Sequence, residues 1–488
     1  MGLLYRIRTY GCQMNVHDSE KVANLLHHAG LRPAEGEDAA DVLLVNTCSI
    51  REKAEHRLYS DLGALRDWKA AVPGRVLGVG GCVAQQQGDA LLRRFPHLDF
   101  VFGTHNVRLV VEMLRAALQG VRQCHTEESA SPERFLLPER HPEFSGTTPG
   151  RAFVTVMEGC DMFCSFCIVP RTRGREISRP ARAIVEESRQ LAEAGVREIT
   201  LLGQTVNAYG RHDQRRGQAG AAGTCGFAEL LREIARLPGL QRLRYTSPHP
   251  IFFDAALVRA HSEVPELCPH VHLPAQSGSD RILAAMRRRY TGSDLRRLAK
   301  ALRSARPGLA LTTDLIVGFP GETEADFRAT LELVREVGFV DSYSFKFSPR
   351  PGTQAAALGD PVAPEEAQER LERLQTLQRT LTLAAHRARV GETARVLVEG
   401  RSARARRSAT SNDLGEGAPI QLQGRDPYHR VVNFSAPSGQ APREGEFVEL
   451  EIVEATPHSL IGILAAAAGR LKEPLQVADE PGAPLAAL

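Results

Sequence analysis

Three cysteines within eight residues constrain this chain more than any other feature. Cys160, Cys164 and Cys167 are spaced C-x3-C-x2-C in the segment 158–170, EGCDMFCSFCIVP. Three thiolates on one short loop repel one another unless a metal or a cluster binds them. A closed structural zinc site uses four protein ligands, whereas three ligands leave one position open for another molecule. The loop therefore predicts an iron–sulfur cluster with one iron that the protein does not ligate.

The composition is typical of a globular chain with several domains. At 488 residues the chain exceeds one ordinary hydrophobic core, so about two to four domains are expected. No run reaches the length of a membrane helix, and the first residues lead into a strand-like pattern rather than a signal peptide. We therefore expect a cytoplasmic protein, where nine cysteines are better explained as metal ligands than as disulfides. The net charge of +3 neither requires nor excludes binding to nucleic acid.

Residues 3–120 alternate between strand and helix patterns, which predicts an α/β domain with a parallel sheet. A cysteine follows each of three strand-like runs: Cys12 after 4–9, Cys48 after 41–45 and Cys82 after 75–79. The carboxyl ends of parallel strands meet at one edge of a sheet, so the three thiols are expected to converge there. Each cysteine alone is more often a core residue. Their repeated placement at strand ends favours a second three-cysteine metal site.

The composition shifts toward Glu, Ser and Pro in 121–145, which predicts a linker in which Cys124 is a spare thiol. Six strand–helix repeats in 146–384 then predict a partial (β/α)6 barrel of the TIM type. The six expected strands are 152–156, 198–202, 242–246, 270–274, 310–317 and 342–347. A glycine- and arginine-rich insertion at 211–226 is expected to be a surface loop, and its Cys225 is not expected to be a ligand.

Barrel chemistry takes place at the carboxyl ends of the strands, and the cysteine loop follows the first strand. The open iron of its cluster can bind the amino and carboxylate groups of a small chelating cofactor. If that cofactor is S-adenosylmethionine, one electron from the reduced cluster breaks its carbon–sulfur bond. Phe166 offers an aromatic face for the adenine, although its other possible role is core packing. Gln204, Ser277 and Asp314 follow or end other strands and are candidate cofactor contacts on that placement alone.

Short strand patterns in 385–466 predict a small β-barrel, and 467–488 is expected to be a disordered tail. The predicted barrel carries several basic residues and one tyrosine: Arg401, Arg404, Arg406, Arg407, Arg425, Arg430 and Tyr428. Such a face fits contact with an RNA backbone, and equally fits a solvated arginine-rich loop.

The motifs along most of the chain resemble those of the radical S-adenosylmethionine methylthiotransferase family. They include TYGCQMNVHDSE at 9–20, NTCSIREKAE at 46–55, VGGCVAQQ at 79–86, MEGCDMFCSFCIVPRTRGRE at 157–176, LLGQTVNAYG at 201–210, HLPAQSGSDRIL at 272–283 and DLIVGFPGET at 314–323. The third domain is similar to the TRAM domains that bind RNA in related enzymes. One departure is Arg171, where relatives usually carry an aromatic residue. With Arg173, Arg175 and Arg179 it makes this loop basic, which fits either a phosphate contact or a solvated surface.

The resemblance implies two [4Fe–4S] clusters with distinct roles. One on Cys160, Cys164 and Cys167 would bind and cleave S-adenosylmethionine, and the other on Cys12, Cys48 and Cys82 would hold the incoming sulfur. The segment 49–54 favours the branch that methylthiolates C2 of N6-dimethylallyladenosine at position 37 of tRNA. A monomer that acts on tRNA, with unknown sulfur and electron donors, is expected.

Two alternatives remain open at this point. One is a methylthiotransferase that modifies an aspartate of a ribosomal protein or another modified adenosine. The other is a non-catalytic RNA-binding protein with structural zinc, in which His249 or His270 would complete the cysteine loop.

Overall fold

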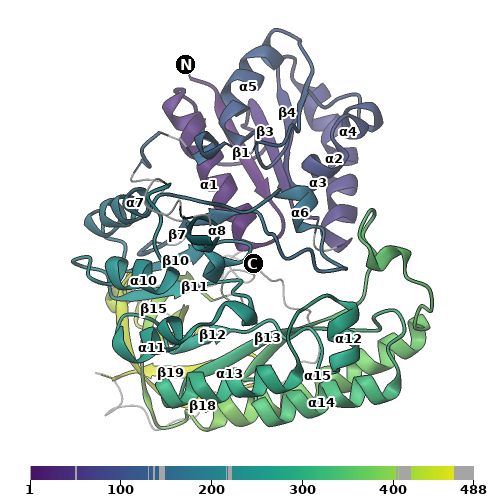
Figure 1. Ribbon diagram of the computed structural model, residues 1–488. Coiled ribbons are helices and arrows are strands. Elements are labelled where there is room, and N and C mark those ends of the chain that lie inside the picture. The colour runs from purple at the N-terminus through teal and green to yellow at the C-terminus, as the bar shows by residue number, and fades with distance from the viewer. Residues whose placement is uncertain are drawn as a thin grey trace.

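The computed structural model describes residues 2–49, 52–129, 131–135, 138–141, 149–215, 217, 222–402, 405 and 419–465. The N-terminal sheet domain, the central partial barrel and the small C-terminal barrel follow one another along the chain (Figure 1). Arg404, Arg406, Arg407 and the expected tail at 467–488 lie outside the described residues. In the part of the chain that the structure describes, no helix combines the length and apolarity needed to cross a membrane.

Six parallel strands form the N-terminal sheet in the spatial order β2-β1-β3-β4-β5-β6. The strands are β1 (Leu4–Thr9), β2 (Arg32–Pro33), β3 (Val42–Thr47), β4 (Val76–Gly81), β5 (Phe100–Phe102) and β6 (Gln123–His125). Every residue of β3 and β4 is buried, because helices cover both faces of the sheet. This confirms the α/β class expected for the first domain.

The helices of this domain divide between two hydrophobic cores, one on each face of the sheet. Helices α1 (Gln13–His28) and α5 (Val110–Leu118) pack on the face that carries Val42 and Leu44. The opposite face, which carries Leu43 and Val45, is covered by α2 (Glu52–Ala71), α3 (Cys82–Gln87) and α4 (Asp89–Arg94). Alternate residues of β3 therefore point into different cores, as the two-residue period of a strand requires.

The predicted linker at 121–145 is partly structured. Its residues Gln123–His125 form β6, which pairs in parallel with β5 and extends the sheet. The domain boundary predicted at residue 120 therefore falls too early. Cys124, expected to be a spare thiol in a linker, lies in this strand and packs against the second core. Three residues are too few to show a strand period, so the composition of the following segment dominated the prediction.

The central unit is an open barrel of six parallel strands, as expected. It consists of β7 (Arg151–Thr155), β10 (Glu198–Leu202), β11 (Arg242–Tyr245), β12 (His270–His272), β13 (Ala310–Val317) and β14 (Asp341–Lys346). The first three strands form one sheet in the order β11-β10-β7 and the last three form another in the order β12-β13-β14. A parallel bridge between Leu243 and Leu267 joins the two sheets. All six expected strands are found within two residues of their predicted bounds.

Helices surround the outside of this barrel and bury the largest hydrophobic core of the chain. They are α7 (Ala181–Glu193), α10 (Phe227–Ala235), α11 (Ala255–Glu263), α12 (Asp280–Ala285), α13 (Gly292–Ala305) and α14 (Glu324–Val337). Helices α13 and α14 each begin with a capping box, at Thr291 and Thr323, which satisfies the free N–H groups of their first turns. The long helix α15 (Pro364–Arg387) packs along β14 and leads into the last domain.

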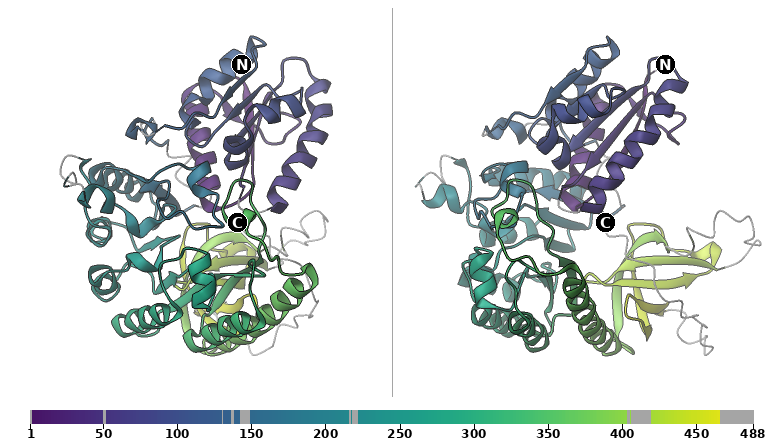
Figure 2. Two further views of the ribbon diagram at one scale, coloured as in Figure 1. Left: turned by 45° about the vertical axis from the view of Figure 1, so that its right-hand side comes forward. Right: turned by 90° about the vertical axis from the view of Figure 1, so that its right-hand side faces the viewer.

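Five strands close into the small C-terminal barrel in the order β15-β16-β17-β19-β18. They are β15 (Thr393–Arg401), β16 (Ile420–Arg425), β17 (Val431–Ala436), β18 (Phe447–Ala455) and β19 (Leu460–Leu464). This confirms the predicted small β-barrel. The right-hand view of Figure 2 shows it beside the partial barrel and away from the N-terminal sheet.

A buried ion cluster attaches this small barrel to the amino-terminal part of the partial barrel. Glu198 at the start of β10 is 1% exposed and pairs with Arg242 and Arg244 on the neighbouring β11. The same two guanidinium groups donate to main-chain carbonyls of the small barrel: Arg242 to Arg425 at 3.0 Å and Arg244 to Asp426 at 2.9 Å. One buried carboxylate therefore orients two arginines that bridge the two domains.

We expect Glu198→Gln to destabilise the protein by about 3–5 kcal/mol, because it leaves two buried arginines without their anionic partner. Urea unfolding checks this. The control is Glu186→Gln, which breaks an exposed ion pair with Arg189 and is expected to leave the midpoint of unfolding almost unchanged. Equal effects of the two substitutions would contradict the role assigned to Glu198.

Candidate functional site

The three cysteines of the N-terminal domain converge at one edge of its sheet. Cys12 is the N-cap of α1 after β1, Cys48 follows β3, and Cys82 is the first residue of α3 after β4. These three strands are neighbours, and the thiols of Cys12 and Cys82 each share a hydrogen bond with the thiol of Cys48. The convergence expected from strand-end placement is therefore observed.

The electrostatics of this first cysteine group favour thiolates, the form that binds metals, at Cys12 and Cys82 but not at Cys48. The hydrogen bond from Cys48 and the positive charge of Arg173 outweigh burial, and together they lower the pKa of Cys12 to about 7 and that of Cys82 to about 6. The pKa of Cys48 is raised well above its usual value, mainly because its thiol bonds to both neighbours. A positive metal centre would stabilise all three thiolates and so offset the raised pKa of Cys48.

Glycine permits the close approach of these loops. Gly11 has a φ of +124°, and a Cβ there would lie 2.2 Å from the Cβ of Cys48. Gly81, directly before Cys82, has a φ of +96°, and a Cβ there would lie 2.4 Å from the carbonyl oxygen of Thr47. Both positions combine a left-handed backbone with a contact that no side chain permits.

Several buried polar atoms at this edge have no hydrogen-bond partner among the described residues. They are the hydroxyls of Thr47 and Ser49, which flank Cys48, and Nη1 of Arg173. Buried donors without partners cost about 1–3 kcal/mol each, so their presence indicates a ligand with acceptor atoms. The sulfides of an iron–sulfur cluster are such acceptors. The residues present therefore fit a cluster at this edge.

The second cysteine group lies on the loop between β8 (Met157–Glu158) and α6 (Val169–Thr172). Cys160 and Cys164 are buried and Cys167 is half-buried. Burial raises the pKa of Cys160, and raises that of Cys167 to about 12. Thiolates in such an apolar site need positive charge close by, which the iron of a cluster provides.

Two polar side chains contact the sulfurs of this loop directly. The Thr205 hydroxyl lies 3.0 Å from Sγ of Cys160, and Nη1 of Arg288 donates to Sγ of Cys164 at 3.2 Å. Arg288 is itself buried and also donates to the Tyr290 hydroxyl at 2.8 Å. Hydrogen bonds to ligating sulfurs are among the factors that set the potential of a cluster.

Both groups lack the arrangement of a single-ion site. In the described ranges, no three His, Cys, Asp or Glu side chains are placed to hold one metal ion. A cluster does not need that arrangement, because its thiolates bind different irons. His249, which was considered as a fourth zinc ligand, is buried and directs Nδ1 at the N–H of Ile251.

Main-chain hydrogen bonds hold the second loop against the barrel. Ser165 donates its N–H to Met286 at 3.1 Å and its hydroxyl to Ala285 at 2.8 Å, both at the end of α12. Gly159, with a φ of +81°, donates its N–H to the side-chain oxygen of Gln204 at 2.5 Å. The loop is thus fixed on both sides of Cys160 and Cys164.

The four predicted cofactor contacts fall into different environments. Phe166 is partly buried between the cysteine loop and a cluster that contains Phe319. Gln204 supports the loop through Gly159, and its buried Nε2 has no partner within the described residues. Ser277 is completely buried, with 0% of its surface accessible, and its hydroxyl forms a hydrogen bond with the hydroxyl of Thr330. The structure therefore gives Ser277 a structural role and does not present it to a ligand.

Asp314 lies on the inner face of the barrel, where polar groups of β12 and β13 meet. Its carboxylate is 3.1 Å from Nε2 of His272, and the ring of Tyr343 on β14 lies 6.1 Å from that imidazole. Although burial lowers the pKa of His272, the negative charge of Asp314 raises it above its usual value. The pair places a hydrogen-bond donor on an inner wall that remains partly accessible.

A buried charge network connects the two cysteine loops. Glu158, two residues before Cys160, pairs with Lys21 at 3.2 Å and with Arg134 at 3.4 Å. Arg173, six residues after Cys167, pairs with Asp18 on α1 at 2.6 Å. Burial raises the pKa of Glu158, but Lys21, Arg134 and Arg173 outweigh burial and hold it at about 2. The helix that begins at Cys12 is therefore fixed to both ends of the other loop.

Sequence reasoning missed two residues of the site and misjudged a third. Arg288 and Thr205 were not predicted, although Thr205 lies next to Gln204 at a strand end. Arg173 was expected to contact phosphate or solvent, but it is 3% exposed and buried between domains. Of the neighbouring arginines, Arg175 is exposed and pairs with Asp161. The sequence around an arginine in a basic loop does not indicate which distant acidic residue will pair with it in the folded protein.

The arginines of the small barrel are mostly engaged within the protein. Arg425 bonds to Glu399 at 3.1 Å and to the carbonyl of His429 at 3.0 Å, and Arg430 donates to the carbonyl of Ala385 at 3.0 Å. Tyr428 stacks with the guanidinium of Arg389 at 4.6 Å. These contacts pack the domains together. Arg425, Arg430 and Tyr428 therefore do not form the free RNA-binding face that was one of the two expectations.

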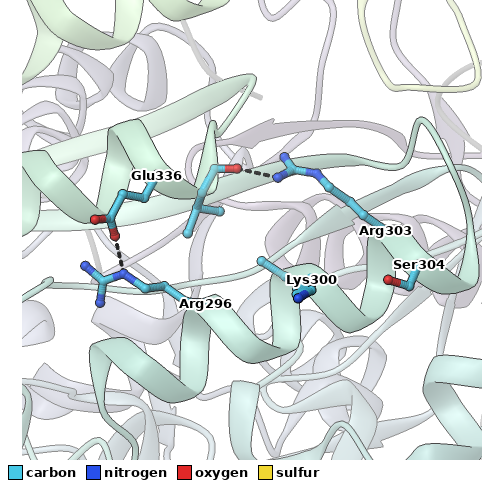
Figure 3. Close-up of a pocket in the computed structure, with 7 residues that line it drawn as sticks. Arg296, Lys300, Arg303, Ser304 and Glu336 are labelled. Carbon is cyan, nitrogen blue, oxygen red and sulfur yellow. Dashed lines mark hydrogen bonds and ion pairs between the residues drawn. The ribbon is translucent and has the colours of Figure 1, made fainter.

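A basic hollow on the outer helices lies apart from both cysteine groups. It is lined by α13 and α14, with Arg296 paired to Glu336 and Arg303 bonded to the end of α14 (Figure 3). Its walls carry no residue from the carboxyl ends of the strands. We therefore assign the site to the cysteine groups and not to this hollow.

Two family models match the chain. Residues 4–103 match a family described as uncharacterized protein family UPF0004, and residues 154–334 match the radical SAM superfamily. The first match contains Cys12, Cys48 and Cys82, and the second contains the C-x3-C-x2-C loop. Each cysteine group thus lies within its own matched region.

Relatives of known name match almost the whole chain. A tRNA-2-methylthio-N(6)-dimethylallyladenosine synthase of Geobacter metallireducens is 49% identical, over 95% of this chain and 98% of its own length. One of the same name from Pseudomonas paraeruginosa is 46% identical, over 94% and 97%. Among solved structures, the radical S-adenosylmethionine methyltransferase TsrM of Kitasatospora setae matches with a TM-score of 0.52 and 15% identity. That match covers 73% of this chain and 74% of TsrM, and supports the fold.

We expect Gly11→Ala to abolish most iron binding by Cys12, Cys48 and Cys82, because its Cβ would displace Cys48. Iron and sulfide analysis checks this in a chain whose Cys160, Cys164 and Cys167 are alanine. Gly30→Ala is the control, since Gly30 has a φ of +87° but nothing within 4 Å of a Cβ. If both variants keep their iron, Gly11 does not shape the site. If both lose it, backbone strain alone is responsible.

Proposed function

The chain belongs to the family of tRNA-2-methylthio-N(6)-dimethylallyladenosine synthases, and on that premise we propose that it adds a methylthio group to C2 of N6-dimethylallyladenosine at position 37 of tRNA. S-adenosylmethionine would be both the methyl donor and the source of the radical. The chain is a radical SAM enzyme, so S-adenosylmethionine and an iron–sulfur cluster belong to its chemistry. The proposal adds a second cluster, on Cys12, Cys48 and Cys82.

The observation that carries this proposal is the pair of three-cysteine groups joined by the buried network of Glu158 and Arg173. A radical enzyme that only abstracts hydrogen needs one such group. Attachment of sulfur needs a second site that can hold sulfur, with an open coordination position. Three thiolates at each site leave that position open.

When bound, the cluster on Cys160, Cys164 and Cys167 would supply the electron that cleaves S-adenosylmethionine, and the cluster on Cys12, Cys48 and Cys82 would hold the incoming sulfur. Around the first, Arg288 and Thr205 hold Cys164 and Cys160 by direct hydrogen bonds. Phe166 offers its ring to the adenine, and Gln204 fixes the turn at Gly159. These residues orient the loop before any ligand arrives, which lowers the cost of reaching the reactive geometry.

The neighbouring domains shield part of the partial barrel from water. The small barrel covers its amino-terminal part through Arg242 and Arg244. The N-terminal domain covers the cysteine loop, where the Thr104 hydroxyl donates to the carbonyl of Thr172 at 2.5 Å. These contacts cover only part of the site, since Tyr343 is 47% exposed, and the bound tRNA would have to cover the rest to protect a radical from side reactions.

A base next to the anticodon lies in a loop, so it can turn out of the stack into such a site without melting a helix. His272 and Asp314 on the inner wall provide polar contacts for it, and Tyr343 provides an aromatic face. We place this activity in the cytoplasm and assign it to a monomer. The RNA contact of the small barrel would then rest on residues other than Arg425, Arg430 and Tyr428.

We expect anaerobically reconstituted protein to form 2-methylthio-N6-dimethylallyladenosine in tRNA, detected by mass analysis of nucleosides. Cys160→Ala should abolish cleavage of S-adenosylmethionine. Cys48→Ala should retain that cleavage and lose methylthiolation, because it removes only the second cluster. Cys225→Ala, which removes a thiol outside both groups, should match the unchanged protein.

The same assay separates the remaining alternatives. Methylthio label on a ribosomal protein instead of tRNA would establish the aspartate-modifying activity, and label on a different adenosine would change the substrate. A colourless protein that binds zinc and leaves S-adenosylmethionine intact would contradict the enzymatic proposal altogether. Full methylthiolation by Cys48→Ala would contradict the role of the second cluster.

A further inference from the structure

We propose that Arg173 is a positioning residue that donates a hydrogen bond to the sulfur of the cluster on Cys12, Cys48 and Cys82 and favours its reduced state. The inference rests on the proposed function, because it requires a cluster at those three cysteines. It goes further by giving one side chain of the S-adenosylmethionine loop a direct effect on the other site.

The position of Arg173 in the chain makes this contact unusual. It is the C-cap of α6, the short helix that begins two residues after Cys167. Its N–H bonds to Val169 at 2.8 Å, which fixes its main chain to the first loop. Helix α6 also packs against α3, the helix that begins at Cys82. Arg173 therefore belongs to one cysteine loop and extends its side chain toward the other.

The guanidinium group is satisfied on one side only. Nη2 donates to the Asp18 carboxylate at 2.6 Å, and the guanidinium also interacts with the Cys82 thiol, but Nη1 makes no hydrogen bond of good geometry within the described part of the chain. The side chain is 3% exposed, so bulk water does not reach Nη1 to accept a hydrogen bond from it. An unpaired charged donor at this depth costs more than an unpaired neutral one, and an acceptor bound in the site would remove that cost.

The charge of Arg173 acts on the cysteines of the N-terminal domain. Its guanidinium group hydrogen-bonds the thiol of Cys82, and its carboxylate partner Asp18 lies on α1, the helix that Cys12 caps. The other cations of the network, Lys21 and Arg134, pair with Glu158, and Lys21 also lies 3.5 Å from Asp18. Arg173 is therefore the residue placed to balance the negative charge of three thiolates and sulfide.

A cation and a hydrogen bond next to a cluster stabilise the reduced, more negative form. Asp18 limits this effect because it neutralises part of the guanidinium charge. Lysine is a poor substitute for arginine here. The planar guanidinium donates to Asp18 and to a second acceptor at the same time, and a single ammonium group cannot reproduce that geometry. The two partners of this ion pair should therefore shift the potential in opposite directions.

The test uses the full chain with Cys160, Cys164 and Cys167 replaced by alanine, so that only the second cluster forms. Its midpoint potential is measured by redox titration with electron paramagnetic resonance, and iron is counted per chain. We expect Arg173→Met to lower the potential, so that the ratio of reduced to oxidised cluster at a fixed poise falls about tenfold or more. The potential of Arg173→Lys should lie between that of the parent chain and that of Arg173→Met. Asp18→Asn should raise the potential above that of the parent.

Arg134→Met is the matched control, because it removes a second buried cation from the same network that pairs with Glu158 instead. It should leave the potential near that of the parent. An unchanged potential in Arg173→Met, or an equal shift in Arg134→Met, would overturn the inference. If Arg173→Met does not fold, the potential of Asp18→Asn is the deciding measurement. A potential of Asp18→Asn that equals or lies below that of the parent would overturn the inference. A parent chain that binds no iron at the three cysteines would instead overturn the proposed second cluster.

Discussion

The architecture depends on the buried charge network between the N-terminal sheet and the cysteine loop of the partial barrel. Buried ion pairs gain little net stability, because desolvation offsets most of the attraction. Their value here is geometric. Glu158 and Arg173 lie on either side of the C-x3-C-x2-C segment, and their partners Lys21 and Asp18 lie on the helix that begins at Cys12. The relative position of the two cysteine groups is thus set by charged groups that tolerate no loss of a partner.

The sequence was sufficient to predict the elements whose pattern is local and repeated. Strands β7, β10 and β11 show clear runs of buried residues, whereas β14 is mostly exposed. Cys12, Cys48 and Cys82 each follow a strand, so topology alone predicted their convergence. The short strand β6 was missed because three residues carry no period. Ser277 illustrates the limit of strand-end placement, since such a position serves either a ligand or a buried hydrogen bond and the residue type does not distinguish them.

The contacts between domains were beyond prediction for a different reason. Arg173 and Asp18 are 155 residues apart, and Arg288 and Cys164 are 124 apart. Neither pair leaves a periodic pattern, and a basic loop looks the same whether its charges meet solvent, phosphate or a buried carboxylate. The same ambiguity applied to Arg425 and Arg430, which the fold uses for packing. Chemistry-bearing cysteines could be identified from spacing, but the side chains that tune them could not.

The attachment of the small barrel has a consequence for how such enzymes can diversify. Arg242 and Arg244 donate hydrogen bonds to the carbonyl oxygens of Arg425 and Asp426, so the main chain of the small barrel supplies much of this domain interface. Carbonyl oxygens are present whatever the side chain. Surface residues of the barrel are therefore free to change without loosening the interface, and a module held in this way can be adapted to different RNAs while the catalytic domains stay as they are.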